Sequence, residues 1–499
     1  MKIILTTLNS RYTHSSLGLR YLYANLKELQ ENASILEFSI NDALQSVAEK
    51  ILMNSPNIVG IGVYIWNALE ASELVQIIKK VSPQTTVILG GPEVSYAPLR
   101  VNFDNADFII QGEGDTAFYD LCKNIINATP PENKIIKMSM PSLKEIELPY
   151  KYYTDEDIQN RYIYVELSRG CPFECEFCLS SMDEKVRAFN LDKVLEEFEN
   201  LWQRGARNFK FVDRTFNLNM RTANRILDFF LEKEEPYFAH FEVIPDHFPA
   251  SLRKKISQFP HGALQLEIGI QTLNPEIANN ISRQLLLDKI EENIIFLENE
   301  TEAHIHLDLI VGLPGETLES FGKNLDELVR LSSCEIQIGI LKKLSGTHIS
   351  RHDETFGMVY SDLPPYDILK NNQLSFHDIQ IMKRFARFWD LTYNSGNFKN
   401  SIDLVWQEES VFENFYKFGM WIYEQTNSTW MISLQRLGEL LFLYLTEVKN
   451  LAPEMVAQKM LEDMMKLKGR AVPAYLKPYS ADFTAKQKVG TSGFNKRQN

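Results

Sequence analysis

Three of the chain's five cysteines stand close together, as Cys171, Cys175 and Cys178. Thiolates at spacings of four and three residues can ligate three corners of an iron–sulfur cube and leave its fourth iron open. A structural zinc site is the alternative, but it needs a fourth ligand. The other cysteines, Cys122 and Cys334, lie far away in the sequence. The spacing therefore favours a [4Fe–4S] cluster.

The composition is that of an ordinary globular protein, with 44% apolar and 24% charged residues among 499. The net charge of 52 − 66 = −14 disfavours a nucleic-acid partner, because neutralising phosphates needs a basic surface. We expect no signal peptide and no membrane span, since no run approaches roughly 20 apolar residues. Five cysteines, mostly clustered, favour a reducing compartment, and we expect a cytoplasmic protein.

Residues 1–135 alternate between strand and helix patterns. The apolar, strand-like runs are Ile3–Leu8, Ile35–Ile40, Ile58–Ile65, Val87–Gly91 and Ala106–Ile110. Strands separated by helical segments predict a doubly wound parallel sheet of the α/β class. Ligands of such sheets bind beyond the carboxyl ends of the strands.

Two glycine-rich loops fall at that edge of the predicted sheet. One contains Gly90 and Gly91, and the other contains Gly112 and Glu113. Glycine lets the backbone approach a ligand closely, although each loop alone could also be a tight turn between strand and helix. Because both loops lie at the ligand-binding edge, we expect a bound cofactor there.

Residues 136–155 carry spaced prolines and are predicted to be a linker, and a second α/β series occupies 156–345. Its predicted strands are Tyr162–Leu167, Phe209–Val212, Phe238–Val243, Leu264–Ile270, His304–Val311 and Glu335–Leu341. Six such units predict a partial (βα)6 barrel with active groups at the carboxyl ends of its strands. The cysteine run follows the first strand and meets that rule.

Other polar and glycine residues lie at the same rim. Asp213 follows the second strand. Glu267 lies in the fourth strand and Gln271 directly follows it, while Asp308 lies in the fifth strand and Gly312 directly follows it. Residues 346–485 change to helical patterns, as in Tyr366–Leu391, Val411–Tyr423 and Leu434–Leu451, and predict a helical extension with an aromatic core. Residues 486–499 are predicted to be a mobile tail.

The cysteine run, with Phe177 before its last cysteine, resembles the signature of the radical S-adenosylmethionine (SAM) superfamily. The motifs Gly269–Thr272 and Asp308–Glu316 are similar to later motifs of its cobalamin-associated branch. The amino-terminal domain, with its glycine loops, resembles that branch's cobalamin-binding domain. The region with Pro364–Tyr366 resembles the carboxyl-terminal extension of an uncharacterised subfamily and implies no chemistry.

The resemblance implies three cofactors: a [4Fe–4S] cluster, S-adenosyl-L-methionine and cobalamin. Cys171, Cys175 and Cys178 would hold the cluster, whose open iron binds S-adenosylmethionine. An electron from an external donor would then release a 5′-deoxyadenosyl radical. The implied reaction is methyl transfer to an unactivated carbon of a small-molecule substrate.

The resemblance makes Asp213, Glu267 and Gln271 candidates to hold the methionine and ribose groups, with Asp308 and Gly312 beside them. The alternative for each is a hydrogen bond that only ties the barrel rim. The superfamily often has a Gly-Gly-Glu-like motif after its second strand, where this chain has Asp213-Arg-Thr. Recognition of the methionine amino group therefore departs from the family pattern.

Cobalamin would lie between the sheet edge and the barrel mouth, near Tyr64, Trp66 and Asn67. Some cobalamin proteins ligate cobalt through the histidine of an Asp-x-His-x-x-Gly motif, and the nearest match here contains His14. Tyr12 replaces the acidic residue, so the imidazole lacks its usual carboxylate partner. We therefore expect His14 to cap the following helix, contact the corrin edge or serve the substrate.

Three other functions stay open at this point. Some relatives use the same cofactors for ring formation or rearrangement instead of methylation. A non-catalytic iron–sulfur or cobalamin sensor would need no S-adenosylmethionine site, which the glycine-rich rim argues against. Radical modification of RNA is disfavoured by the acidic net charge.

Overall fold

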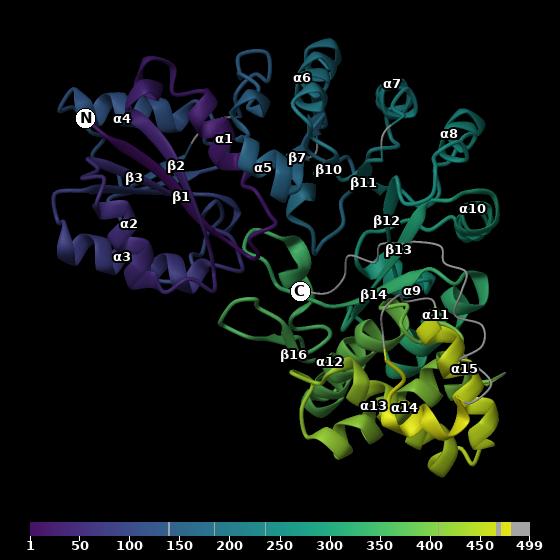
Figure 1. The fold of residues 1–499 in the computed structure, drawn as a ribbon. Coiled ribbons are helices and arrows are strands. Elements are labelled where there is room, and N and C mark those ends of the chain that lie inside the picture. The colour runs from purple at the N-terminus through teal and green to yellow at the C-terminus, as the bar shows by residue number, and fades with distance from the viewer. Residues whose placement is uncertain (138–139, 184, 235, 408, 466–470, 481–499) are drawn as a thin grey trace.

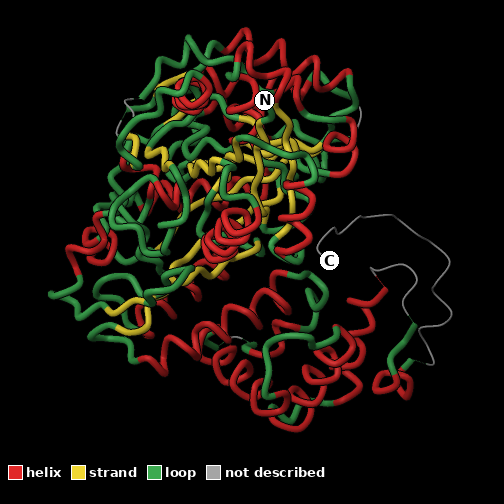
Figure 2. Tube along the Cα trace, turned by 90° about the vertical axis from the view of Figure 1, so that its left-hand side faces the viewer, coloured by secondary structure: helices red, strands yellow, loops and turns green. Residues whose placement is uncertain are grey.

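The computed structural model describes residues 1–137, 140–183, 185–234, 236–407, 409–465 and 471–480. The chain forms two parallel sheets with helices around them and a third, mainly helical part (Figures 1 and 2). This confirms the predicted α/β class with a helical carboxyl-terminal region. The predicted mobile tail, 486–499, lies outside the described residues. Within them, no helix has the length and apolarity that crossing a membrane requires.

The amino-terminal sheet has six parallel strands in the order β2-β1-β3-β4-β5-β6. The strands are β1 (Ile3–Asn9), β2 (Ala33–Ser39), β3 (Ile58–Gly62), β4 (Thr86–Gly90), β5 (Phe108–Gln111) and β6 (Ile135–Lys137). The doubly wound prediction is confirmed, but the sequence reading counted five strands. β6 crosses the predicted start of the linker at 136, and its three residues at the sheet edge are too short for a periodic signal.

Helices cover both faces of this sheet. Helices α1 (Leu17–Ala24) and α4 (Ala117–Ile126) pack on one face, and α2 (Leu44–Leu52) and α3 (Ala68–Val81) pack on the other (Figure 1). Along β1, Ile3 and Leu5 join the first layer, while Ile4 and Leu8 join the second. This alternation follows from the two-residue period of a strand.

The central sheet is also parallel, in the order β14-β13-β12-β11-β10-β7, and confirms the predicted partial barrel. Its strands are β7 (Ile163–Val165), β10 (Asn208–Phe211), β11 (Phe238–Val243), β12 (Leu264–Gln271), β13 (His304–Val311) and β14 (Glu335–Ile340). The helices of this part are α5 (Asp155–Asn160), α6 (Leu191–Gln203), α7 (Met220–Leu231), α8 (Ala250–Ile256), α9 (Pro275–Asn280), α10 (Leu287–Glu300) and α11 (Leu318–Leu331). Figure 1 shows α6, α7, α8 and α10 in a row along one side of the sheet.

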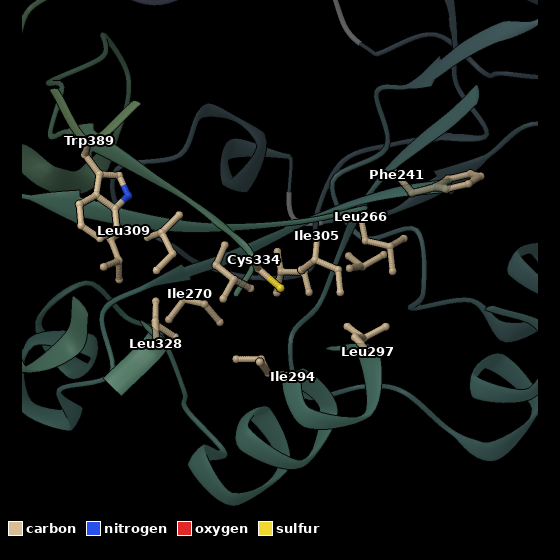
Figure 3. Packing of buried hydrophobic residues seen from close by; sticks show 14 of the residues in the cluster. Phe241, Leu266, Ile270, Ile294, Leu297, Ile305, Leu309, Leu328, Cys334 and Trp389 are labelled. Atoms are coloured by element: carbon tan, nitrogen blue, oxygen red, sulfur yellow. The ribbon is translucent and has the colours of Figure 1, made fainter. Parts of the chain in front are cut away.

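The two faces of the central sheet differ in chemistry. On the helix side, Leu266 and Ile305 lie with Ile294 and Leu297 of α10 in one apolar core (Figure 3). The alternate residues of the strands lie on the inner, concave face. They are polar or charged: Lys210, His240, Glu242, Gln265, Glu267, His306, Asp308, Glu335 and Gln337. The inner face is therefore where charged ligands would be met.

The carboxyl-terminal part consists of α12 (Phe376–Trp389), α13 (Val411–Thr426), α14 (Leu434–Leu443) and α15 (Pro453–Met465). A short hairpin, β15 (Val359–Tyr360) with β16 (Ile368–Lys370), precedes them. The predicted helix beginning at residue 366 is wrong at its start. The chain first forms β16, and α12 begins only after Ser375, whose hydroxyl accepts from the amide of Asp378 in a capping box.

Aromatic side chains fill the core of this helical part. The Trp389 ring lies 4.8 Å from that of Phe415, and Phe385 lies 5.0 Å from Phe415 between ring centroids. All three rings are buried. The aromatic residues thus form the core that the sequence predicted.

Candidate functional site

The three cysteines lie on one closed loop at the carboxyl end of β7. Strands β8 (Ser168–Arg169) and β9 (Arg187–Ala188) pair antiparallel and close the loop at its base. Gly170 begins the loop with φ of 91°, and a Cβ there would meet the carbonyl oxygens of Asp183 and Lys185, just before the returning strand. Glycine is therefore required for the chain to enter the cysteine loop.

The three thiols are free and lie near one another. Burial raises the pKa of Cys171 and Cys175, and the neighbouring thiols raise it further. Arg283 opposes this effect, since its guanidinium lies 3.6 Å from the Cys175 sulfur. Because metal-binding cysteines are thiolates, a nearby cation fits the donor set of an iron–sulfur cluster.

A charged network covers the carboxyl half of the inner barrel face. The Arg214 guanidinium lies 2.5 Å from the Glu242 carboxylate, and His240 Nε2 lies 3.0 Å from Glu267. Burial acts to raise the pKa of Glu267, but the hydrogen bond with His240 lowers it below its usual value. Burial, together with Glu267 and Glu242, raises the pKa of Asp308 well above normal. The pair Glu267 and Asp308 can thus hold one ionised and one neutral carboxyl group.

Asp213 forms hydrogen bonds within the barrel rim. Its two carboxylate oxygens accept from the Leu167 amide, at 2.9 Å, and from the Ser168 hydroxyl, at 2.6 Å. Burial raises its pKa to about 7. This geometry favours the alternative given for Asp213, a bond that holds the strand before the cysteine loop. Its predicted contact with S-adenosylmethionine stays a prediction.

The other rim residues lie on the turns after β12 and β13. Gln271 has φ of 67°, and its side-chain amide occupies the space beside Gly269 where a Cβ would project. Arg283 donates to the Gly269 carbonyl, which brings the turn after β12 to Cys175. Gly312 has φ of 93° and donates its amide to the buried Glu316, whose pKa burial raises to about 8.

A cavity of about 250 Å³ opens at the carboxyl ends of β3, β4 and β5. Glycines line it: Gly18, Gly60, Gly62, Gly90, Gly91, Gly112 and Gly114. At Gly90 no protein atom lies within 4 Å of where a Cβ would be, whereas at Gly91 a Cβ would come 2.5 Å from the Val63 carbonyl. The cavity is largely apolar, with Leu89 and Phe118 in its lining. A backbone-lined slot of this kind fits a flat part of a large cofactor such as cobalamin.

Tyr64, Trp66 and Asn67 surround the end of β3 in different ways. Tyr64 lines the cavity and stacks on Trp66, with 4.5 Å between ring centroids. Trp66 is 43% exposed and donates to the Leu8 carbonyl. Asn67 is fully buried, and its amide bonds to Thr7, Leu8 and Gly62. Asn67 therefore holds the strand ends together, while the Tyr64 and Trp66 pair is placed to meet a ligand.

His14 lies between the two sheets. Its backbone forms a bridge with Tyr162, and its Nδ1 hydrogen-bonds to the Tyr164 hydroxyl on β7. Burial lowers its pKa. The described lining of the cavity does not include His14. Its imidazole is thus directed to the barrel, and its assignment to the cofactor stays a prediction.

An ionic cluster joins the cavity to the root of the cysteine loop. Arg169 lines the cavity and lies 2.8 Å from Asp115, 3.0 Å from Glu113 and 2.9 Å from Glu166. Glu113 also pairs with Arg187 on the returning strand. The loop predicted to bind cofactor therefore contacts the base of the cysteine loop directly. Only Gly170 separates Arg169 from Cys171 along the chain.

The segment 342–370 contacts both parts of the site. Its His352 Nε2 lies 2.7 Å from the carboxylate of Glu176, which is 2% exposed and lies between Cys175 and Cys178. Arg351 pairs with the same carboxylate. At its other end, Tyr366 hydrogen-bonds to Glu93 of the amino-terminal domain. We call this segment the strap.

Sequence reasoning missed Arg169, Arg283 and His240. It also missed the contacts of the Glu176 carboxylate with Arg351 and His352. Arg169 stands two residues before the first cysteine, so its position was a usable signal. Arg283 and His352 come from distant parts of the chain, and only the fold brings them to the cysteines. His240 lies in a short strand whose other residues, apart from Glu242, are apolar, so from the sequence it resembles an ordinary core residue.

Family models match three consecutive regions. The B12 binding domain matches residues 3–122, the radical SAM superfamily matches 165–328, and a protein of unknown function, DUF4080, matches 354–495. The first two matches cover the cavity and the cysteine loop described above.

Known proteins are similar over much of the chain. An uncharacterized methyltransferase of Pyrococcus horikoshii, PH0819, is 26% identical over 68% of this chain and 78% of that protein. Two further curated methyltransferases are matched over 47% and 49% of their own length. The structure of the cobalamin-dependent S-adenosylmethionine radical enzyme OxsB has a TM-score of 0.63 and 13% identity, over 97% of this chain and 81% of that one.

The radical S-adenosylmethionine methyltransferase TsrM of Kitasatospora setae has a TM-score of 0.59 and 14% identity, over 73% of this chain and 78% of that one. At such identities the structural likeness shows the fold, and the family matches carry the chemistry. They confirm the predicted set of a [4Fe–4S] cluster, S-adenosylmethionine and cobalamin. The chain therefore combines a B12 binding domain, a radical SAM domain and a carboxyl-terminal region of unknown function, in that order.

Proposed function

We propose that this cobalamin-dependent radical SAM enzyme transfers a methyl group to an unactivated carbon of a small molecule. The observation that carries the proposal is the ionic cluster around Arg169, which joins the glycine-lined cavity to the root of the cysteine loop. Two cofactors that share one substrate must lie next to each other, and this contact would bring their two candidate sites together. The names of the curated methyltransferase relatives support the same reaction.

When bound, the cluster, S-adenosylmethionine and cobalamin supply radical formation and a transferable methyl group. The chain's own residues hold and insulate these groups. Cys171, Cys175 and Cys178 would ligate the cluster, with Arg283 as the nearby positive charge. Glu267 and Asp308 face the inner side of the barrel, where they would meet the positive charges of S-adenosylmethionine. The cavity beside Gly90 would receive part of the cobalamin.

The substrate approaches between the two sheets in this proposal, near His14 and the carboxyl end of β7. It is a small molecule of unassigned class, and an external electron donor in the cytoplasm reduces the cluster. Neither a membrane nor a nucleic acid is a partner in this proposal, given the acidic net charge of −14.

The test is anaerobic reconstitution of the full chain with iron, sulfide and cobalamin, followed by mass spectrometry of the products of S-adenosylmethionine. Methyl transfer predicts S-adenosylhomocysteine together with 5′-deoxyadenosine after reduction. Samples without reductant serve as the control for radical chemistry. Reduced protein that cleaves no S-adenosylmethionine would contradict the proposal.

A second candidate is a radical reaction without methyl transfer, such as ring formation or rearrangement. It is favoured by the likeness to OxsB, a cobalamin-dependent S-adenosylmethionine radical enzyme, which spans 97% of this chain. In that case reduced protein would form 5′-deoxyadenosine without S-adenosylhomocysteine. The same experiment therefore separates the two candidates.

A further inference from the structure

A group of metal-ligand side chains lies at the amino-terminal end of the barrel strands. His304 and His306 occupy alternate positions on β13, so both point to the same face of the sheet. Glu335 on β14 stands directly opposite His306 in the parallel register. Among the residues that the structure describes, these three offer ligand atoms that all lie within 4.8 Å of one another.

The individual contacts converge on the Glu335 carboxylate. His304 Nε2 lies 3.0 Å from one of its oxygens, and His306 Nε2 lies 3.2 Å from the other. The two imidazole rings lie 4.7 Å apart between centroids and nearly perpendicular. Ligands of a tetrahedral zinc ion with bonds of about 2.0–2.1 Å lie roughly 3.3 Å apart. Small side-chain movements would therefore place all three groups around one ion.

Neighbouring amides support the orientation of His306. Its Nδ1 lies 2.8 Å from the Gln337 side-chain amide and 3.3 Å from that of Gln265. A metal-bound histidine uses its second ring nitrogen in this way, and the Gln337 amide can present its oxygen to an Nδ1–H by rotating half a turn. Nε2 is then the nitrogen that faces the other two ligands.

The two histidines of the group differ in exposure, as expected for a site that an ion enters from solvent. His306 is 3% exposed, whereas the His304 side chain is 47% exposed. The buried histidine fixes the site, and the exposed one leaves a path by which an ion enters. Three protein ligands leave the fourth position of a tetrahedral ion to water.

We propose that His304, His306 and Glu335 bind one divalent transition-metal ion, for which zinc is the probe. Two neutral imidazoles and one carboxylate are ligands that zinc prefers. His306 stands six residues before Gly312, so roughly 20 Å of strand separates the ion from the carboxyl rim of the barrel. The ion therefore stabilises the amino-terminal half of the barrel, where Glu267 of β12 stands directly beside His306 in the parallel register.

The test uses the full chain with Cys171, Cys175 and Cys178 replaced by alanine, so that the cluster thiolates cannot bind zinc. After zinc loading and gel filtration, elemental analysis should find one zinc per chain. Cobalt(II) loading should give the visible bands of a nitrogen and oxygen site of low coordination number. Zinc should also raise the temperature of thermal unfolding.

Adding His304→Ala to this chain should weaken zinc binding at least tenfold and remove the thermal effect. Because His304 is half exposed, this variant is expected to fold, and Glu335→Gln provides a second variant that keeps the side-chain shape. The matched control is His261→Ala, since His261 is 88% exposed and pairs with Glu302 at 3.3 Å.

Stoichiometric zinc in the parent chain and the control, with loss in both site variants, would support the proposal. A chain that retains no zinc would overturn it and leave the group as hydrogen-bonded side chains. Zinc retained equally by His304→Ala and Glu335→Gln would also overturn it. Neither readout depends on enzyme activity, so the result is independent of the proposed function.

Discussion

The two parallel sheets of this chain carry opposite kinds of side chain at the carboxyl ends of their strands. The amino-terminal sheet removes side chains, so that glycines and apolar groups line a cavity. The central sheet adds charged side chains, with Arg214, Glu242 and Glu267 on its inner face. A large cofactor can be recognised by shape where the backbone is exposed, whereas a charged cofactor needs counter-charges. The same six-stranded plan therefore serves two kinds of ligand.

The largest expected effect is the loss of the cluster at the central sheet while the amino-terminal sheet still binds cobalamin. Cys175→Ala removes one of three cluster ligands, so reconstituted protein should lose its cluster iron and release no 5′-deoxyadenosine. Cobalamin binding, measured by absorption after gel filtration, should persist because the cavity lies in the other sheet. Cys334→Ala is the control, since its buried thiol belongs to the core behind β14. Radical chemistry retained in the Cys175 variant would refute the cluster assignment.

The reverse result, loss of cobalamin binding with the cluster retained, is expected when a side chain fills the cavity. Gly90→Leu places a side chain where no protein atom lies within 4 Å, so the sheet should fold while the cavity is blocked. The new side chain should overpack the cobalamin-bound state, which typically costs about 1–3 kcal/mol. Cobalamin affinity should therefore fall about tenfold or more. Titration followed by absorption measures the affinity, and iron content should stay unchanged.

The control for this change is Gly339→Leu on β14, where a Cβ would make only ordinary contacts with Leu309 and Ile310. It should leave cobalamin affinity unchanged. Equal cobalamin binding by Gly90→Leu and the unmodified chain would show that the cofactor does not use the cavity.

A smaller effect is expected at the strap. His352→Ala removes one partner of the buried Glu176 carboxylate, which costs about 1–3 kcal/mol locally. The cysteine loop should open more often, and a chelator should extract iron roughly tenfold faster. The nearby, exposed His348→Ala is the control. Equal extraction rates in the two variants would mean that the strap does not stabilise the cysteine loop.

The smallest change is expected at the junction of the two sheets. His14→Ala should leave the cobalamin spectrum largely intact, because the His14 ring bonds to Tyr164 of the barrel and lies outside the described cavity lining. Absorption spectra of the loaded protein across pH provide the measurement. Disappearance of an imidazole-ligated spectrum would make His14 a cobalt ligand and contradict this interpretation.

Much of the fold was predictable because continuous apolar runs mark buried parallel strands, as in β3 and β4. β6 was not, because three residues at an exposed edge carry no period. The start of α12 was misplaced because the helix begins where Ser375 caps it, and the apolar spacing upstream belongs to β16. Local pattern fails where a tertiary pairing or a cap decides the boundary.

The site shows the same limit. Cysteine spacing predicts a cluster because all three ligands lie on one loop. Arg283 was invisible because its contact with Cys175 depends on the turn after β12 and has no sequence period. Asp213 was visible, yet its two hydrogen bonds to 167 and 168 could not be read from its position alone. Position along a strand predicts the location of a side chain but not its partner.

The strap has a consequence for how the three regions could be exchanged between relatives. Its Ser345 hydroxyl bonds to the Pro98 carbonyl, and its Ile349 amide bonds to the Glu176 carbonyl. A chimera that grafted a foreign carboxyl-terminal region onto residues 1–341 would discard these contacts and leave the Glu176 charge buried. The graft should succeed only if residues 342–370 of this chain are kept with residues 1–341. The three regions matched by family models therefore cannot be exchanged independently.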